Sequence, residues 1–252
     1  MRSIRRNARR GLNVAARLRA GLPPRPESVT PEAPTDLYQA HLSIYRFFAR
    51  FTAGRRVLDL GCGSGQGSRE LIESGARAVL GLDIDARSIR YARRRFAAPG
   101  LSFEVANAEA LPAGLGEFDV VVSSNMFEHL SDPAAALERV TSLLEPGGTF
   151  VLAVPPIYDE RSRAVTERGR HHRSNRPIEA WLTDLRSRFG EVSQFAHMPR
   201  EGAEPDMDSP FPSRLGPGDF RFDPVGPGIA AARTLTAIFV AAGPRAGSAV
   251  SR

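Results

Sequence analysis

The sequence contains no lysine and only one cysteine among its 252 residues. The single thiol, Cys62, excludes an intramolecular disulfide framework and any zinc site built from several cysteines, which suits a reducing compartment. No apolar run approaches the roughly 20 residues that a membrane-spanning helix needs. We therefore expect a cytoplasmic protein rather than an integral membrane protein.

Charged residues occur in ordinary number, but the positive ones are concentrated at one end. All 34 basic residues are arginine, the net charge is +6, and eight of the arginines lie within residues 1–25, before the first acidic residue, Glu27. Without that segment the chain is close to neutral, so we expect no nucleic-acid partner for the body of the protein. The apolar fraction of 42% excludes wholesale disorder.

Residues 1–34 are predicted to form an arginine- and proline-rich extension. Two interpretations stay open for residues 1–25: a solvated, partly helical segment, or a peripheral anchor that contacts an anionic membrane surface or an acidic partner. Both rest on apolar residues that recur at three- and four-residue steps, as on one helix face: Ile4, Ala8, Leu12, Ala15, Leu18 and Leu22.

Residues 35–244 are predicted to form one α/β domain. A helix is expected over 35–54, with Thr35 as its N-cap. The next hundred residues alternate between helices and short apolar strands. Strands this rich in Val, Leu and Phe are typical of a sheet buried on both faces, which favours parallel strands covered by helices. The expected strands are 56–60, 78–82, 101–105, 118–122 and 149–154, and the helices between them are 64–73, 86–96 and 133–144.

The last third of the chain is less regular. A helix is predicted at 178–188, and two more strands at 192–196 and 235–241 complete a doubly wound, mostly parallel sheet of seven strands. Residues 199–228 are rich in Pro, Gly and Asp and are predicted to form a loop or lid. Residues 245–252 are expected to be a flexible tail, and the sequence makes no prediction of oligomeric state.

The strongest motif follows the first predicted strand. Gly61, Gly63 and Gly65 allow positive φ angles and the close approach of a ligand to the backbone. The loop connects a strand to a helix, and Asp83 ends the next strand about 20 residues later. This layout is typical of a nucleoside-binding α/β unit, in which a carboxylate accepts hydrogen bonds from ribose hydroxyls.

The residues around the loop indicate which nucleoside it binds. Gln66 stands where a dinucleotide fingerprint has its third glycine, and the Gly-Lys-Ser/Thr of a nucleotide P-loop is missing. Asp59 precedes the glycines, where a carboxylate would repel a pyrophosphate but attract a cation. S-adenosylmethionine carries a sulfonium and an ammonium beside its ribose, so Asp59 and Asp83 match it. A structural role of Asp59, in which it holds the loop through backbone N–H groups, stays open.

These motifs resemble the class I S-adenosylmethionine-dependent methyltransferases of the broad type 11-like group, with an Asp-x-Gly-x-Gly-x-Gly loop and a Glu-His-Leu segment after the fourth strand. The resemblance covers residues from about 38 to 198. It implies a Rossmann-like fold, S-adenosyl-L-methionine as cofactor, and a set of cofactor-binding residues: Asp59, Gly61, Gly63 and Gly65 at the methionine end, Asp83 at the ribose, Ile84, Asn107 and Ala108 at the adenine, and Ser124 and Asn125 at the methyl-transfer pocket.

One of these positions departs from the family pattern. Asn107 stands where the family usually has aspartate, and an amide oxygen still accepts a hydrogen bond from the adenine amine. The alternative for Asn107 is a plain turn residue.

The candidate catalytic residues lie after the fourth strand and in a later loop. His129 is the first candidate for a general base, because the ligand crevice of such sheets lies at the carboxyl ends of the strands. The alternative is that the Glu-His-Leu segment only anchors the start of the next helix. Glu128 is a second candidate, with an ion ligand or a structural acceptor as alternatives. His171 and His172 precede the helix at 178–188. One of them is expected to contact the acceptor, with His172 as the catalytic candidate, and a solvated basic loop is the alternative. Because adjacent histidines point in different directions, we expect no metal site from this pair.

The expected activity is methyl transfer to a small-molecule acceptor, with a hydroxyl favoured over nitrogen or carbon. A sugar or glycan is one hypothesis, because Tyr45–Phe51 and the loops resemble methyltransferases of bacterial surface-glycan synthesis; secondary metabolites and quinone precursors are others. Pro155-Pro156-Ile157-Tyr158 resembles a base-methylation motif but follows the fifth strand, which disfavours that chemistry. Two alternatives stay open: a non-catalytic cofactor-binding module, and an RNA methyltransferase that uses the basic extension.

Overall fold

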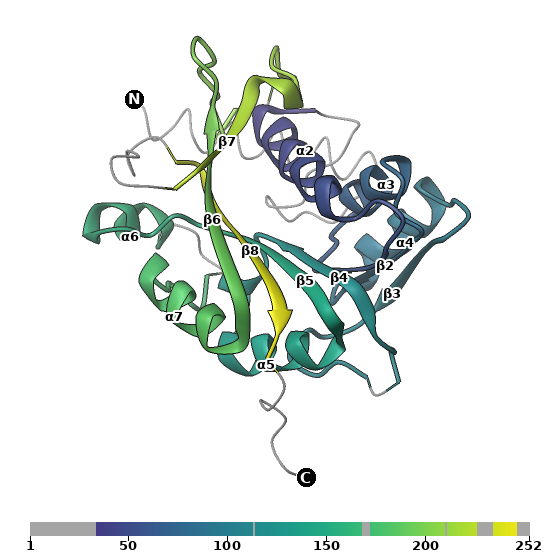
Figure 1. The fold of residues 1–252 in the computed structure, drawn as a ribbon. Helices are drawn as coiled ribbons and strands as arrows, with labels where there is room; N and C mark the ends of the chain where they lie inside the picture. The colour runs from purple at the N-terminus through teal and green to yellow at the C-terminus, as the bar shows by residue number, and fades with distance from the viewer. Residues whose placement is uncertain (1–33, 113, 168–171, 210, 226–233, 246–252) are drawn as a thin grey trace.

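A computed structural model describes residues 34–112, 114–167, 172–209, 211–225 and 234–245. The predictions for the N-terminal extension, for His171 and for nearly all of the C-terminal tail fall outside these residues. Within them, a twisted sheet is flanked by helices on both faces (Figure 1). None of the helices in the described part of the chain has the length and apolar character needed to cross a bilayer.

The sheet has eight strands in the order β3-β2-β1-β4-β5-β8-β6-β7. The first five run parallel to one another, and β8, β6 and β7 pair antiparallel at the far edge. The doubly wound, mostly parallel sheet is thus confirmed, with one strand more than the seven expected. The strands are β1 (Arg56–Leu60), β2 (Ala78–Asp83), β3 (Leu101–Val105), β4 (Phe118–Ser124), β5 (Leu144–Val154), β6 (Phe189–Pro199), β7 (Phe220–Pro224) and β8 (Thr236–Pro244).

Successive strand residues point to opposite faces of the sheet. Because these residues are apolar on both faces, helices cover both. Val57 packs in the cluster beneath α2 (Asp36–Phe48) and α3 (Gln66–Glu73), whereas Leu58 packs in the cluster beneath α5 (Pro133–Leu143) and α7 (Ile178–Arg188). Val151 and Leu152 divide in the same way on β5. Both members of each pair are fully buried, which is the pattern expected of a parallel sheet between two helical layers.

Helix α4 (Ala86–Arg95) completes the crossover from β2 to β3 and packs its apolar side against Cys62 and Phe103. Thr35 accepts a hydrogen bond from Tyr38 N at 3.3 Å, which confirms the predicted cap of α2. The helix ends at Phe48 and continues as the 3₁₀ turn η1 (Ala49–Phe51). Short helix α6 (Glu160–Thr166) was not expected from the sequence.

The segment predicted as a loop or lid is partly structured. It contains the 3₁₀ turn η3 (Pro217–Asp219) and strand β7, which pairs with β6. Asp36, at the start of α2, accepts hydrogen bonds from Ser213 Oγ and, at 2.8 Å, from Asp206 N. The segment is therefore attached to α2 in the structure, and its role as a lid stays a prediction.

The strand order reverses between β1 and β4, because the chain builds outward to β3 and then returns to the other side of β1. The carboxyl ends of both strands lie at one edge of the sheet, and a ligand crevice is expected at such a switch point. Ser123 Oγ of β4 donates to Leu60 O of β1 at 2.7 Å, which fixes the two strand ends side by side.

Candidate functional site

The glycine loop lies at the carboxyl end of β1 and opens α3. Gly61, Gly63 and Gly65 all have left-handed φ angles, of 84°, 56° and 87°. A Cβ on Gly61 would lie 2.4 Å from Met126 Cγ, so this glycine allows the loop to pack against the residues after β4. No described atom lies within 4 Å of the corresponding position on Gly63. The loop is therefore packed on one side and open above Gly63, as ligand approach requires.

Asp83 ends β2 beside this loop. Its carboxylate accepts a hydrogen bond from Gly63 N at 2.9 Å and another from Asp85 N at 2.8 Å. These two contacts hold the side chain against the loop, and a carboxylate oxygen is the kind of group that accepts hydrogen bonds from ribose hydroxyls. The structure thus brings Asp83 and Gly63 together, as the sequence predicted.

Asp59 is fully buried within the sheet rather than exposed in the loop. Tyr45 Oη donates to its carboxylate at 3.0 Å and Ser68 Oγ at 2.5 Å. Burial raises the pKa of Asp59 to about 7, although both hydrogen bonds act in the opposite direction; the nearby charge of Asp83 raises the pKa further. Asp59 therefore has a structural role, through side-chain hydroxyls rather than backbone N–H groups. Its contact with the cofactor stays a prediction.

Tyr45 is a site residue that the sequence did not single out for this position. Its ring lies over Gly67 of α3, where a Cβ would approach ring atoms to 2.2 Å. Tyr45 itself is 5% exposed. The sequence feature that points to this contact is Gly67, because a glycine inside a helix often has a packing reason. Nothing in the sequence indicated which side chain would pack against it.

The expected adenine side contains two exposed apolar side chains. Ile84 is 63% exposed and Val105 is 51% exposed, and they follow or end the neighbouring strands β2 and β3. Asn107 Oδ1 accepts a hydrogen bond from Glu109 N at 3.0 Å, which is the turn role proposed as its alternative. Ala108 packs against the main hydrophobic core. The adenine contacts of Ile84, Asn107 and Ala108 remain predictions.

The end of β4 has an unusual backbone. Asn125 has a φ of 50° and is the one described non-glycine residue with a positive φ. Its N–H donates to Ala153 O at 2.9 Å, and its Nδ2 donates to Ser124 Oγ at 3.3 Å. A left-handed asparagine held by a neighbouring strand is the kind of constraint that clusters at functional sites.

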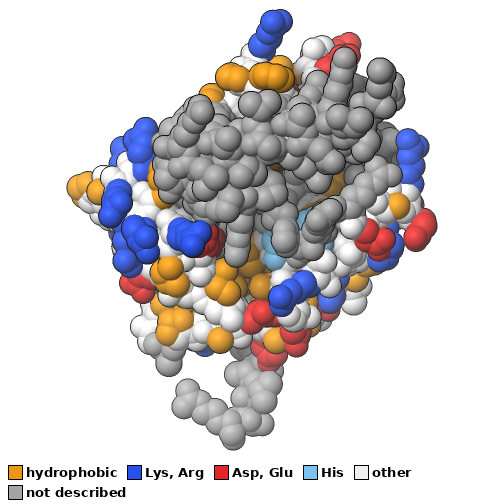
Figure 2. Space-filling view, turned by 180° about the vertical axis from the view of Figure 1, so that it is seen from behind, with side chains coloured by type: hydrophobic (Ala, Val, Ile, Leu, Met, Phe, Trp, Pro, Cys, Tyr) orange, Lys and Arg blue, Asp and Glu red, His pale blue; other side chains and the backbone are white. Residues whose placement is uncertain are grey.

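Glu128, His129 and His172 come together beyond this turn. Glu128 and His129 belong to the 3₁₀ turn η2 (Phe127–His129), and His172 lies between α6 and α7. One oxygen or ring nitrogen from each lies within 4.8 Å of the others. The two imidazole rings are 5.1 Å apart at an angle of 68°, and Glu128 is 3% exposed. Histidine side chains reach the surface beside apolar ones on the face that Figure 2 shows.

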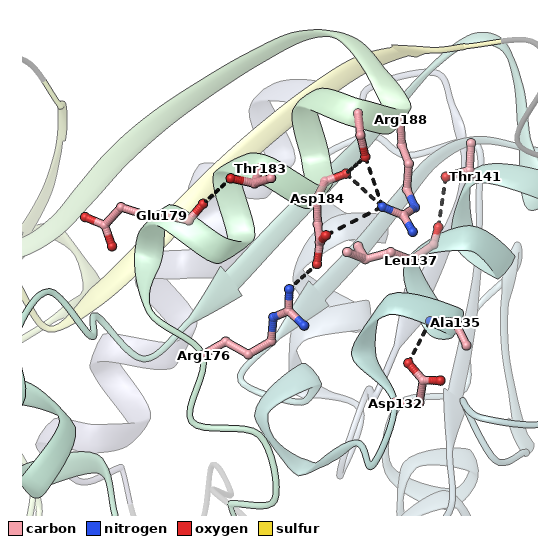
Figure 3. A network of polar contacts seen from close by, with 10 residues as sticks. Asp132, Ala135, Leu137, Thr141, Arg176, Glu179, Thr183, Asp184 and Arg188 are labelled. Atoms are coloured by element: carbon pink, nitrogen blue, oxygen red, sulfur yellow. Dashed lines mark hydrogen bonds and ion pairs between the residues drawn. The ribbon is translucent and has the colours of Figure 1, made fainter.

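The segment that carries His172 is fixed at several points. Arg173 N and Ser174 N both donate to the backbone carbonyl of Glu128, at 2.8 and 3.0 Å. Arg176 forms an ion pair with Asp184 of α7, and its guanidinium lies 5.0 Å from the ring centre of Trp181. Figure 3 shows the Asp184 carboxylate between the guanidinium groups of Arg176 and Arg188. His172 is therefore held opposite η2 by tertiary contacts.

Comparisons with known proteins identify the family of this domain. Residues 57–148 match a family model described as a methyltransferase domain. A probable S-adenosylmethionine-dependent methyltransferase of Mycolicibacterium smegmatis is 36% identical over 118 residues, which are 47% of this chain and 45% of that protein. A ubiquinone biosynthesis O-methyltransferase of Xanthomonas axonopodis pv. citri is 32% identical over 164 residues, covering 58% of this chain and 68% of that protein.

Solved structures show the same fold. An S-adenosylmethionine-dependent methyltransferase from Thermotoga maritima superposes with a TM-score of 0.62 at 16% identity, over 82% of this chain and 91% of that one. The chain spans less than half of the Mycolicibacterium relative but more than two thirds of the Xanthomonas one. From the matched domain, the fold and the latter relative, we conclude that this chain belongs to the class I S-adenosylmethionine-dependent methyltransferases, whose methyl donor is S-adenosyl-L-methionine.

Proposed function

We propose that the protein transfers the methyl group of S-adenosyl-L-methionine to a hydroxyl of a small molecule. The observation that carries the proposal is the grouping of Glu128, His129 and His172, two of which closely follow a residue that packs on the glycine loop. Met126 packs on Gly61 of that loop and lies two residues before Glu128. A donor site and a group of acid–base side chains thus adjoin at the carboxyl edge of the sheet.

The donor is proposed to lie across the glycine loop. Asp83 accepts from the ribose hydroxyls, and the open space above Gly63 admits the methionine end. Ile84, with Asn107 and Ala108, contacts the adenine. Buried Asp59 supports the loop from beneath and attracts the sulfonium and ammonium through space, because a charge in a poorly solvated position is weakly screened.

The transfer itself is an in-line displacement. A lone pair of the acceptor oxygen forms the new bond to the methyl carbon, and the carbon–sulfur bond breaks with its electrons going to sulfur. S-adenosylhomocysteine leaves as a neutral thioether, and the acceptor proton passes to His129 or Glu128. Holding the oxygen near its attack distance accounts for much of the rate gain, because the sulfonium already activates the methyl group.

Hydroxyl acceptors are favoured by two observations. An oxygen nucleophile benefits from a nearby base, which the histidine and glutamate side chains supply. The Xanthomonas relative is named an O-methyltransferase. Within this class, phenols such as quinone precursors and sugars are the two acceptor groups to compare.

The donor site is tested by calorimetric titration of the purified protein with S-adenosylmethionine. Gly63→Val and Asp83→Ala are each expected to weaken binding by about 100-fold or more, since one fills the ligand space and the other removes the ribose acceptor. Gly54→Val is the matched control, because Gly54 also has a left-handed φ with no described atom within 4 Å, yet lies outside the loop. Unchanged affinity in both loop variants would refute the site.

The acceptor is tested with radiolabelled donor and fractionated cell extract, followed by purified phenols and sugars. Label in an alkali-stable ether supports hydroxyl methylation. Label on nitrogen or carbon contradicts it, and label on RNA favours the nucleic-acid alternative. Donor binding without label transfer to any fraction favours a non-catalytic module.

A further inference from the structure

We propose that Glu128, His129 and His172 bind one divalent transition-metal ion in the acceptor pocket. From the sequence alone we expected no metal site from the adjacent pair His171 and His172, and an ion ligand was one open alternative for Glu128. The structure instead places His172 beside a glutamate and a histidine from a distant segment. One imidazole from the loop and two donors from η2 then form a set of three protein ligands.

The spacing of the three donor atoms fits a metal ion after small side-chain adjustments. Ligand atoms about 2.1 Å from a tetrahedral Zn²⁺ lie about 3.4 Å from one another. The donor atoms here lie within 4.8 Å of each other, so the largest gap to close is about 1.4 Å. The His129 and His172 rings are half-buried and their centres lie 5.1 Å apart, so rotation of these rings is the adjustment that the proposal requires.

The chemistry of the donors selects the class of metal. Imidazole nitrogens suit Zn²⁺, Fe²⁺, Co²⁺ and Ni²⁺, whereas Mg²⁺ and Ca²⁺ prefer sets made of oxygen ligands alone. Two neutral imidazoles and one carboxylate leave a divalent ion with a net charge of +1. Three protein ligands also leave at least one coordination position for a water or a substrate oxygen, as in catalytic zinc sites.

The backbone around the cluster favours a fixed ligand geometry. The hydrogen bonds from Arg173 N and Ser174 N to Glu128 O tie the two ligand-bearing segments directly to each other. Glu128 is 3% exposed, so its carboxylate is oriented by packing rather than by solvent. Ligand side chains that are already held in place lower the free-energy cost of ordering them when the ion binds.

The proposed role of the ion rests on the proposed function. With an acceptor hydroxyl in the free coordination position, the metal ion and its ligands, of net charge +1, lower the pKa of the hydroxyl. They also hold its oxygen in line with the methyl group. Because His129 and Glu128 are metal ligands in this arrangement, they do not serve as the base, and the hydroxyl proton leaves to water. The oxygen lone pair attacks the methyl carbon, the carbon–sulfur bond breaks with its electrons going to sulfur, and S-adenosylhomocysteine is released. No oxidant or reductant is needed.

The site is tested by equilibrium dialysis of the full chain against Zn²⁺ and Co²⁺, with metal content and Co²⁺ visible absorption as readouts. We expect about one equivalent bound, with Co²⁺ bands of a nitrogen–oxygen site, and affinity reduced by about 100-fold or more in His172→Ala and Glu128→Gln. Glu179→Gln, an exposed acid on α7, is the control that should bind normally. Binding that survives both ligand substitutions, or that is lost in His171→Ala and kept in His172→Ala, would overturn the proposed ligands.

Donor affinity, measured on the same samples, separates the two proposals. Absence of metal binding with intact S-adenosylmethionine affinity overturns the metal site alone. Loss of donor binding in the wild-type protein overturns the proposed function instead. If metal binds as expected, a chelator should reduce methyl transfer while leaving donor affinity unchanged, and transfer that is insensitive to a chelator that strips the ion refutes the catalytic role.

Discussion

The proposed donor side and the proposed acceptor side of this molecule are organised in different ways. The donor side, from Asp59 to Asp83, lies within one strand–helix–strand unit, and Asp83 contacts Gly63 directly. The acceptor side joins η2 to a segment that enters from beyond β5. A short stretch of sequence therefore specifies the first, whereas the docking of distant elements specifies the second. The comparison predicts that substitutions on one side leave ligand binding on the other side largely intact.

The largest expected effect lies where helix α2 meets the donor side. Gly67→Ala should lower the free energy of unfolding by about 1–3 kcal/mol, because the new methyl group would overlap the Tyr45 ring. In the Tyr45→Ala background the same substitution should raise stability by about 1 kcal/mol, since alanine is the better helix former. Urea denaturation of the four proteins measures this reversal of sign. A stabilising Gly67→Ala in the wild type would show that Tyr45 does not pack there.

An intermediate effect is expected on the pH dependence of folding stability, through Asp59 on the donor side. The pKa of Asp59 is raised by burial from 3.8 to about 7, so the folded protein retains a proton that the unfolded chain releases. This contribution to stability is present below pH 4 and is lost as the pH rises through about 7. We expect the stability of the wild type relative to Asp59→Asn to fall between pH 5 and pH 8, as measured by urea denaturation. A constant difference would mean that Asp59 is already ionised at pH 5.

Bound donor should oppose this loss, because a sulfonium near Asp59 favours the ionised carboxylate. The donor affinity of the wild type is therefore expected to rise from pH 6 to pH 8 relative to that of Asp59→Asn. Calorimetry in two buffers of different ionisation enthalpy counts the released protons. Equal pH profiles for the two proteins would limit Asp59 to its structural contacts.

The smallest expected effect on the free energy of unfolding comes from a substitution on the acceptor side. Asp184→Asn removes the partly exposed ion pairs with Arg176 and Arg188 and should change the free energy of unfolding by about 1 kcal/mol. The segment that carries His172 loses one of its attachments, so metal affinity and methyl transfer should fall by about tenfold. Donor affinity should stay within about twofold of wild type. Equal losses of donor affinity and metal affinity would contradict the prediction that the two sides bind their ligands independently.

Much of the fold follows from patterns within short stretches. The five parallel strands were predicted within two residues of their observed ends, except that β5 begins at Leu144, because each is an apolar run between turn residues. Strand β7 was not predicted, since Phe220–Pro224 ends in proline and lies in a segment rich in turn residues. It forms because β6 offers an unpaired edge, and such a partner is invisible in a local pattern.

The candidate site also has a part that short stretches of sequence predict and a part that depends on tertiary contacts. The glycine loop and Asp83 were predicted together because their spacing is fixed by one strand and one helix. The hydrogen bond from Tyr45 to Asp59 was not predicted, because it depends on how α2 lies across the sheet. The grouping of His172 with Glu128 and His129 depends likewise on the path of the chain after β5.

The sequence by itself determined the strand–helix alternation, the glycine loop and the acid at the end of the second strand, because these depend on side-chain periodicity and backbone freedom over a few residues. Only the tertiary structure decided that Asp59 is buried beneath Tyr45 and that His172 faces Glu128. Those contacts join residues far apart in the chain, and their formation depends on the packing of whole helices and strands, which no local pattern encodes.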